Sequence, residues 1–269
     1  MKIVVLGSHG IIGSGLCKHL KDIGHQVITW DIKITPMHDL SVTENLTGLK
    51  HVMNDVDFVF FLAFDIGGAK YITGAGIDFI NNNLMIMMNT FSRLDGKKFI
   101  FASSTMYNMS HVYGTLKKLG EEYTSRLGGL SARFWNVYGP EKSSLRSHVI
   151  ADMIHKHKTK GYIDLMTSGE EERQFLHTED CAKALTQLMY NYDEIIKTEK
   201  TVDVTNFIWT KIKDVANLIS DDVRVTDITV TTHDRVNEPS RFILKYWKPE
   251  ISLTEGVASL QSNYQYHIL

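Results

Sequence analysis

The amino-acid sequence predicts an α/β fold in which a doubly wound parallel sheet is followed by a small α+β C-terminal lobe. Two observations predict this fold: strand-like apolar segments alternate with helical ones, and a glycine-rich turn follows the first strand directly. The 269 residues can bury one large core, and the elements become shorter and more mixed beyond Gly139. We therefore expect a main domain over residues 1–140 and a substrate lobe over residues 141–269, some segments of which return to the main sheet.

Short runs of β-branched or aromatic residues predict the strands. The first run, KIVVL, breaks at a glycine, and DFVFFLAF is apolar nearly throughout, as in a strand covered on both faces. The strands expected in the main sheet are 2–6, 26–31, 57–64, 97–104 and 129–135. Those expected in the lobe are 162–166, 173–177, 201–206 and 223–230.

Amphipathic spacing of apolar residues predicts the helices between these strands. The segment TENLTGLKHVMNDV is one of them, and Thr43 is a suitable N-cap for it. The expected helices are 11–23, 43–56, 77–94, 113–127 and 145–158.

Composition and charge argue against several classes of partner. The formal net charge is −2, so we expect neither a nucleic-acid nor a membrane surface, and no apolar run approaches the roughly 20 residues that span a bilayer. The first residues form a strand-like run without the features of a signal peptide, and Cys17 and Cys181 are expected as buried free thiols, which suits a reducing cytoplasm. His155 and His157 lie two apart on a helix and point to different faces, so no metal site is expected.

The motif GSHGIIG predicts a dinucleotide-binding loop, because it lies between the first strand and the first helix. Gly7 permits the tight turn, Gly10 lets the backbone approach a phosphate, and Gly13 lets the helix pack on the sheet. Ile11 and Ile12 begin the helix, whose N-terminal N–H groups and dipole suit a pyrophosphate.

The residue at the end of the second strand indicates the cofactor. Asp31 can accept hydrogen bonds from both ribose hydroxyls and would repel a 2′-phosphate, which favours NAD over NADP. Lys33 and His9 can weaken this preference if either contacts a phosphate. Asp39 and Leu40 follow at a distance where a side chain can meet the adenine. A solvated aspartate at a strand end is the alternative interpretation of Asp31.

The stretch SSTMYNMSHVYGTLK contains candidate proton-transfer residues. Tyr113 and Lys117 lie on one face of a helix, and Ser103 ends the preceding strand. A tyrosine with a pKa near 10 is a poor base at neutral pH, but a nearby ammonium and a positively charged nicotinamide would both lower that pKa. We expect these three groups to move a proton on and off a hydroxyl while hydride passes to or from the cofactor. The alternative is an ordinary helix start with a polar approach.

These residues and several later motifs make the chain resemble the extended short-chain dehydrogenase/reductases, in their nucleotide-sugar epimerase/dehydratase branch. The resemblance implies a Rossmann fold and cofactor contacts at Leu62 and Ala63 in FLAF. The motifs that fall in family order are GSHGIIG, FLAF, FASSTMY, YGTLK, ARFWNVYGP, RQFLHTEDCAKAL and YWKPEISLTEGV.

Within this branch the segments DIGGAKYI, INNNLMIMMN and SHVIADMIHK are most similar to GDP-fucose synthase and GDP-mannose 3,5-epimerase. That similarity implies substrate contacts at Asn136 and Arg173 and an acid role for His148 in epimerisation. The alternatives are that Asn136 is a turn residue, that Arg173 is a surface charge and that His148 is a partly exposed helix residue. Arg235 and Arg241 are further candidates for phosphate contacts.

Three departures from these relatives narrow the expected reaction. Thr105 occupies a candidate catalytic position where the 3,5-epimerising relatives carry a cysteine, and a threonine hydroxyl is far too weakly acidic for that role. His9 stands where GDP-fucose synthase, an NADPH enzyme, has an arginine. Only a few residues separate Tyr107 from Tyr113, where relatives insert a loop of roughly two dozen residues; losing a surface loop costs little stability.

The leading functional hypothesis is an NAD-dependent enzyme that transfers hydride at a ring carbon of a nucleotide-diphosphate sugar, of the 4-epimerase type. The first alternative is net reduction of a 4-keto sugar with NAD(P)H, and a minor one is a non-catalytic dinucleotide-binding sensor. A dehydratase is disfavoured because no acidic residue follows the serines of SSTMY. The family resemblance also implies a homodimer through helices 77–94 and 113–127.

Overall fold

The main sheet of the computed structural model has six parallel strands in the order β2-β1-β3-β4-β5-β9. The structure describes residues 1–68, 71–72, 74, 76–108, 111–141, 146–225 and 237–264. This doubly wound sheet confirms the predicted fold class. The strand order reverses between β1 and β3, and the carboxyl ends of strands at such a reversal form the crevice where ligands bind. The strands are β1 (Lys2–Leu6), β2 (Gln26–Trp30), β3 (Phe58–Phe61), β4 (Phe99–Ser104), β5 (Leu130–Phe134) and β9 (Thr201–Val204).

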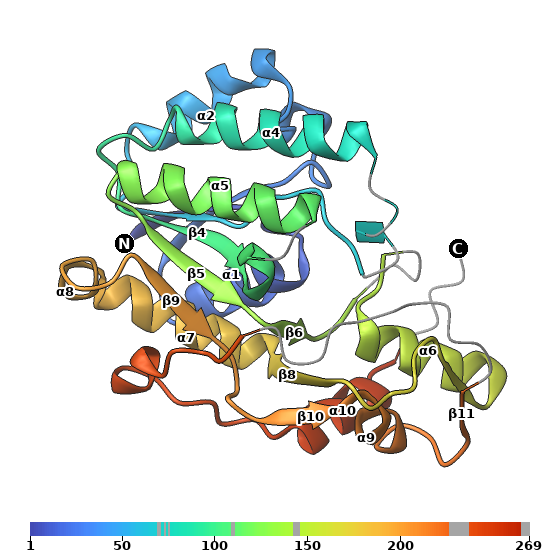
Figure 1. Ribbon diagram of the computed structural model, residues 1–269. Coiled ribbons are helices and arrows are strands. Elements are labelled where there is room, and N and C mark those ends of the chain that lie inside the picture. Colours follow the sequence, from blue (N-terminus) through green and yellow to red (C-terminus); the bar gives the residue numbers. More distant parts are fainter. Residues whose placement is uncertain are drawn as a thin grey trace.

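Helices cover both faces of this sheet (Figure 1). On one face lie α1 (Ile11–Asp22) and α7 (Thr178–Tyr190), followed by the short helix α8 (Tyr192–Ile195). On the other face lie α2 (Leu46–Met53), α4 (Ile77–Phe91) and α5 (Val112–Arg126). Because side chains alternate along a strand, neighbouring residues such as Val4 and Val5 belong to the two different cores.

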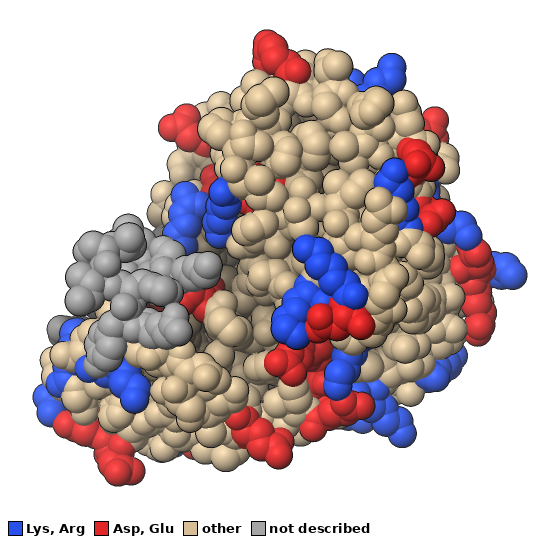
Figure 2. All heavy atoms as spheres, turned by 180° about the vertical axis from the view of Figure 1, so that it is seen from behind, with Lys and Arg blue, Asp and Glu red and all other residues tan. Residues whose placement is uncertain are grey.

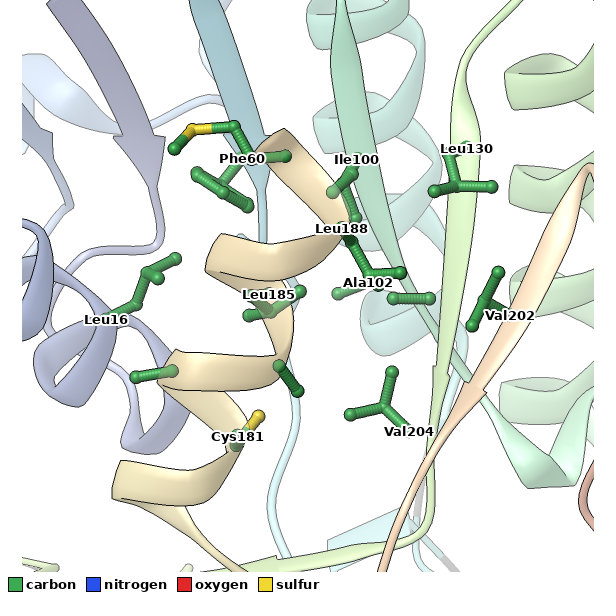
Figure 3. Close-up of a cluster of buried hydrophobic side chains, with 14 of the residues drawn as sticks. Leu16, Phe60, Ile100, Ala102, Leu130, Cys181, Leu185, Leu188, Val202 and Val204 are labelled. Carbon is green, nitrogen blue, oxygen red and sulfur yellow. The ribbon is translucent and has the colours of Figure 1, made fainter. Parts of the chain in front are cut away.

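The core under α7 contains apolar side chains from the main sheet, including those of strands β3, β4, β5 and β9 (Figure 3). Leu185, Leu188 and Cys181 of α7 point toward Phe60, Ile100, Ala102, Leu130, Val202 and Val204. Cys17 and Cys181 are both buried free thiols, as expected. Both α7 and β9 follow residue 140 in the sequence, yet α7 packs on the main sheet and β9 is its last strand. The boundary between the two domains at residue 140 stays a prediction.

The C-terminal lobe packs around a third core. In its larger sheet the middle strand β8 pairs in parallel with β6 and antiparallel with β10, and a two-stranded sheet pairs β7 with β11. The strands are β6 (Asn136–Tyr138), β7 (Ile163–Leu165), β8 (Glu172–His177), β10 (Trp209–Lys211) and β11 (Val223–Val225). The helices are α6 (Val149–Lys160), α9 (Ile212–Asn217) and α10 (Leu253–Ser262).

Several predicted elements differ from those observed. The predicted helix 43–56 is a 3₁₀ turn, Thr43–Asn45, followed by α2, so Thr43 is not an N-cap. The predicted strand 57–64 ends at Phe61, because the chain then turns into a loop that side chains of α4 hold in place. The short strands β6 and β10 were not predicted. Residues 226–230 of the last predicted strand, and Arg235, lie outside the described residues.

The distribution of charged side chains on the surface agrees with the formal net charge of −2. On the face shown in Figure 2, acidic and basic side chains lie intermixed, and a broad area carries neither. Over the described residues, every helix is too short or too polar to cross a membrane.

Candidate active site

The glycine loop brings the first strand, the first helix and the end of β3 into close contact. Gly7 has a φ of 84°, and a Cβ there would lie 2.6 Å from the Ala63 backbone nitrogen. A Cβ on Gly13 would lie only 2.1 Å from the Gly7 carbonyl oxygen. Both positions therefore require glycine. The same contacts place Ala63, and Leu62 before it, beside the loop.

Gly10 differs from Gly7 and Gly13, because the surrounding protein leaves room for a side chain at this position. A Cβ there would meet one atom, the Gly7 carbonyl oxygen, at an ordinary 3.4 Å. Gly10 is also the N-cap of α1 and provides no side-chain cap, so the first N–H groups of the helix, from Ile11 and Ile12, are oriented to bind an anion. The space beside Gly10 at the start of α1, which a Cβ would narrow, fits a pyrophosphate.

Asp31 is held at the same edge of the sheet, next to the loop. Its Oδ2 accepts a hydrogen bond from the His9 backbone N–H at 2.8 Å, and its Oδ1 accepts one from the Lys33 backbone N–H at 2.9 Å. The Lys33 ammonium donates to the His9 carbonyl oxygen at 3.1 Å, so Lys33 is tied to the loop. A buried carboxylate in this position fits the ribose hydroxyls of NAD.

The two residues predicted near the adenine are anchored locally. Asp39 Oδ1 accepts hydrogen bonds from the Ser41 backbone N–H at 2.8 Å and the Ser41 hydroxyl at 2.7 Å. The side chain of Leu40 is buried, and its carbonyl oxygen accepts from the Asn89 amide at 2.8 Å. Their contact with adenine stays a prediction.

Lys117 lies in a dry environment on the face of α5 that packs against β4. Its ammonium donates to the Ala102 carbonyl oxygen at 2.8 Å and lies 3.5 Å from the centre of the Phe64 ring. Burial lowers the pKa of Lys117 from 10.5 to about 7, although the negative charge of Glu121 acts in the opposite direction. The lysine therefore changes charge close to neutral pH.

Tyr113 lies one turn before Lys117 and is also buried. Its side chain is hydrogen-bonded to that of Ser104, and burial nevertheless raises its pKa to about 12. We predicted that Lys117 would lower the pKa of Tyr113. In the protein alone the pKa is raised instead, because the effect of burial is larger than that of the neighbouring groups. The Lys117 ammonium lies 5.7 Å from the centre of the Tyr113 ring. The positive charge expected of a bound nicotinamide is the remaining means of lowering this pKa.

The two serines that end β4 have different partners. The Ser103 hydroxyl donates to Glu121 Oε1 at 2.6 Å, whereas Ser104 is hydrogen-bonded to Tyr113. Ser103 was predicted from the sequence and Ser104 was not, although the serine doublet marks both. Glu121 was also missed; the signal was its position four residues after Lys117, which repeats the spacing of the Tyr–Lys pair.

Two further catalytic candidates have partners of their own. Thr105 accepts from the Asn237 amide through its carbonyl oxygen at 2.5 Å and its hydroxyl at 3.2 Å, which ties the C-terminal segment to the end of β4. His148 precedes α6, and its Nδ1 lies 2.6 Å from Glu141 Oε1 while its backbone N–H donates to Glu141 Oε2 at 2.8 Å. The catalytic roles of both stay predictions.

The residues predicted to contact substrate share the larger sheet of the lobe. Asn136 begins β6 and is in register with Phe175 of β8, two residues beyond Arg173. Both candidates are half-buried, and Arg173 donates to the Glu172 carbonyl oxygen at 2.7 Å. Arg241 lies 5.7 Å from the centre of the Phe207 ring. None of the described residues group three or more His, Cys, Asp or Glu side chains in a way that could hold a metal.

Comparison with known proteins agrees with this geometry. The chain is 29% identical over 233 residues to GDP-mannose 3,5-epimerase 1 of Oryza sativa subsp. indica, which covers 70% of this chain and 61% of that relative. It is 25% identical to GDP-L-fucose synthase of Sinorhizobium fredii, over 96% of this chain and 93% of the relative. The chain thus spans about three fifths of the length of the first curated relatives it matches.

The fold is that of solved sugar-nucleotide enzymes. The structure of Thermus thermophilus UDP-glucose 4-epimerase in complex with NAD matches with a TM-score of 0.80 at 18% identity, over the full length of both chains. The family model described as "NAD dependent epimerase/dehydratase family" matches residues 3–204, which include the glycine loop, Asp31, Tyr113 and Lys117. The predicted resemblance is confirmed, and the chain belongs to the NAD-dependent epimerase/dehydratase family.

Proposed function

We propose that this protein is an NAD-dependent enzyme that transfers hydride at a ring carbon of a nucleotide-diphosphate sugar, in the manner of a 4-epimerase. The observation that carries the proposal is the buried Tyr113–Lys117 pair, which lies at the same edge of the sheet as the glycine loop and Asp31. A hydroxyl with a tunable pKa beside a dinucleotide site suits proton removal coupled to hydride transfer.

Bound NAD would supply the hydride acceptor. Gly7, Gly10 and the start of α1 would hold its pyrophosphate, and Asp31 its adenosine ribose. Tyr113, ionised to the phenolate, would take the proton from the substrate hydroxyl, and Lys117 would hold positive charge that stabilises the phenolate before this transfer. Burial of both side chains excludes water that would otherwise compete for the proton.

The runner-up is net reduction of a 4-keto sugar, as the similarity to GDP-L-fucose synthase suggests. Thr105 favours a reaction without epimerisation beside a carbonyl, because its hydroxyl is too weakly acidic for proton exchange there. This supports either candidate over a 3,5-epimerase. A non-catalytic sensor is disfavoured, since Tyr113 and Lys117 are both retained.

The proposed assembly and compartment rest on two further observations. Exposed apolar side chains of neighbouring helices support a homodimer through residues 77–94 and 113–127: Ile77, Met85 and Met88 of α4, and Val112, Leu119 and Tyr123 of α5. The buried thiols Cys17 and Cys181 suit the cytoplasm, where thiols stay reduced.

The proposal is tested by incubating purified protein with UDP- and GDP-hexoses, with and without added NAD(P)H. An epimerase interconverts sugars without consuming added cofactor, whereas a reductase oxidises NAD(P)H in proportion to product. Mass analysis of the purified protein for bound dinucleotide identifies the cofactor. Tyr113→Phe should lower kcat by about 10²–10⁴-fold, because it removes the group that transfers the proton.

Tyr123→Phe is the matched control, since this exposed tyrosine lies on the same helix. It should keep full turnover. Full activity of Tyr113→Phe would show that the proposed catalytic tyrosine is wrong.

A further inference from the structure

An ion pair joins the loop after β3 to the segment that enters α6. The Arg146 guanidinium donates from Nη1 to Asp65 Oδ1 at 2.8 Å, and it lies 4.1 Å from the centre of the Tyr71 ring. The Tyr71 hydroxyl donates to the same Asp65 oxygen at 2.8 Å. The backbones also meet, because the Gly68 N–H donates to the Arg146 carbonyl oxygen at 3.2 Å. A Cβ on Gly68 would lie 2.4 Å from the Ser147 carbonyl oxygen, so this approach requires glycine.

The ion pair lies close in sequence to the candidate catalytic pair. Asp65 directly follows Phe64, whose ring contacts both Lys117 and Tyr113. Arg146 lies just before α6, on the other side of the contact. A few residues on each side of the ion pair therefore connect the start of α6 to the wall of the site where the sugar would react.

Asp65 is held in place from α4, independently of Arg146. Its backbone N–H donates to Asn83 Oδ1 at 2.8 Å, and its carbonyl oxygen accepts from Asn83 Nδ2 at 3.1 Å. Its Oδ2 accepts from the Asn82 amide at 3.2 Å. Asn83 is fully buried, so these bonds anchor Asp65 to the packed main domain. The half-exposed Arg146 side chain thus binds a carboxylate that is already fixed.

From these contacts we infer that Arg146 is a positioning residue: through its ion pair with Asp65 it sets the distance between the start of α6 and the Tyr113–Lys117 pair. A nucleotide sugar that is held by the lobe and reacts at that pair is correctly aligned only while the two stay joined, and small misplacements of a reacting group cost much rate. The inference rests on the proposed function, because it assigns Arg146 to alignment of the sugar in that reaction.

Kinetic constants at the two ends of the substrate test this role. Arg146→Gln should lower kcat by about 10-fold, because a partly exposed ion pair and a ring contact are each worth less than that. The Ki of UDP or GDP and the Kd of NAD should stay within about 2-fold, since their own contacts are unchanged. The substrate is whichever UDP- or GDP-hexose the wild-type enzyme turns over. A weakened nucleotide together with an unchanged kcat would overturn the inference.

The conservative variant Arg146→Lys should recover part of the rate. Lysine keeps the positive charge for Asp65 but loses the planar guanidinium that lies over Tyr71, so we expect a loss of only about 3-fold in kcat. This variant also replaces Arg146→Gln in each experiment if the glutamine variant does not fold. A loss with Arg146→Lys as large as with Arg146→Gln would mean that the charge has no part in the alignment, which would contradict the inference.

A double-mutant cycle identifies Asp65 as the partner. Asp65→Asn keeps an acceptor for the Tyr71 hydroxyl and should lower kcat by a factor similar to that of Arg146→Gln. Adding Arg146→Gln to it should cost less than about 3-fold more, because the ion pair is already broken. Lys160→Gln is the matched control, since it removes a similarly exposed ion pair of α6 that lies within the lobe, and it should alter neither kcat nor KM. Additive losses in the cycle would refute the role of the pair.

Backbone amide exchange gives a readout that needs no substrate. The Gly68 N–H is bonded across the contact to Arg146, whereas the Asp65 N–H is bonded to Asn83 of α4. By NMR, Arg146→Gln should speed exchange at Gly68 by at least about 10-fold and leave exchange at Asp65 unchanged. Unchanged exchange at Gly68 would contradict the inference. Equal acceleration at both amides would also do so, because it would mean that the substitution loosens the whole loop.

These readouts separate the inference from the proposed function. If no nucleotide sugar reacts with the wild-type enzyme, the proposed function fails, and amide exchange at Gly68 decides whether Arg146 holds the two segments together. If wild-type turnover is normal and the cycle is additive, the proposed function stands and the positioning role of Arg146 fails.

Discussion

The Lys117 ammonium lies 3.5 Å from the centre of the Phe64 ring, and the Tyr113 ring packs edge-on against the same ring with centroids 5.9 Å apart. Phe64 belongs to the loop that leaves β3, so one aromatic side chain contacts both members of the candidate pair. It excludes water from the lysine, which disfavours the ammonium, and its π face attracts the ammonium, which partly compensates. The two effects can be separated by substitution.

Phe64→Leu should lower the pKa of Lys117 below its present value of about 7. Leucine keeps the site apolar but removes the attraction of the ring, which is worth about 1 kcal/mol and hence about 0.7 pH units. Because the protonated form is lost as pH rises through the pKa, the alkaline limb of the kcat/KM profile should move to lower pH by about that amount.

Phe79→Leu is the matched control, since Phe79 packs against Phe64 in the same aromatic cluster. It should leave the limb in place. Movement of the Phe64→Leu limb to higher pH would show that the ring acts mainly by excluding water.

The sequence was sufficient to predict the features whose causes are local. The glycine loop, Asp31 and the Tyr113–Lys117 spacing each depend on a short segment, and the structure places all of them at one edge of the main sheet. The alternating strands and helices likewise determined the fold class, because each buried strand shows its own apolar run.

What the sequence did not predict depends on contacts between distant segments. Glu121 meets Arg133 and Ser103 only because α5 packs over β4 and β5, and Phe64 reaches Lys117 only through the loop after β3. The competition between burial and charge at Tyr113 also requires the packed structure, since spacing alone gives the neighbours of a group and not its exposure to water.

Gly10→Ala should weaken NAD binding without destabilising the protein. The added Cβ makes only an ordinary contact at 3.4 Å, but it narrows the space at the start of α1 where the pyrophosphate is expected. We expect at least about a 10-fold rise in the Kd of NAD by calorimetric titration, equivalent to about 1.4 kcal/mol, with an unchanged Tm.

Gly76→Ala is the control for this substitution, because a Cβ at this helix N-cap meets nothing within 4 Å. Gly13→Ala should instead lower the Tm, since its Cβ would overlap the Gly7 carbonyl oxygen. Unchanged NAD affinity in Gly10→Ala would place the pyrophosphate elsewhere.

Met88→Lys should convert the proposed dimer to a monomer. Met88 is 56% exposed on α4, next to the exposed side chains of α5, and a charge buried in a dimer interface without a partner is strongly destabilising. Light scattering at micromolar concentration should report twice the chain mass for the wild type and the chain mass for the variant.

Ile208→Lys tests whether any exposed apolar residue has this effect, since Ile208 is 63% exposed but lies just before β10 in the lobe. This variant should remain a dimer. A monomeric wild type would contradict the proposal directly.

Asp203→Asn should stabilise the protein progressively as pH rises. The carboxyl of Asp203 is buried, and burial raises its pKa from 3.8 to about 6, with Arg133 and the Ser240 N–H acting against this rise. The folded protein therefore binds the proton more tightly than the unfolded chain, and wild-type stability falls as pH rises from about 4 through 6. Asparagine keeps a hydrogen-bond acceptor for Ser240 and removes this dependence.

Between pH 5 and pH 8 the free energy of unfolding of the variant should gain about 1.4 kcal/mol relative to the wild type, measured by urea unfolding. Asp193→Asn, at a side chain that is 71% exposed, should show no such pH-dependent difference, and a flat difference for Asp203→Asn would mean that the Arg133 charge fully compensates the burial.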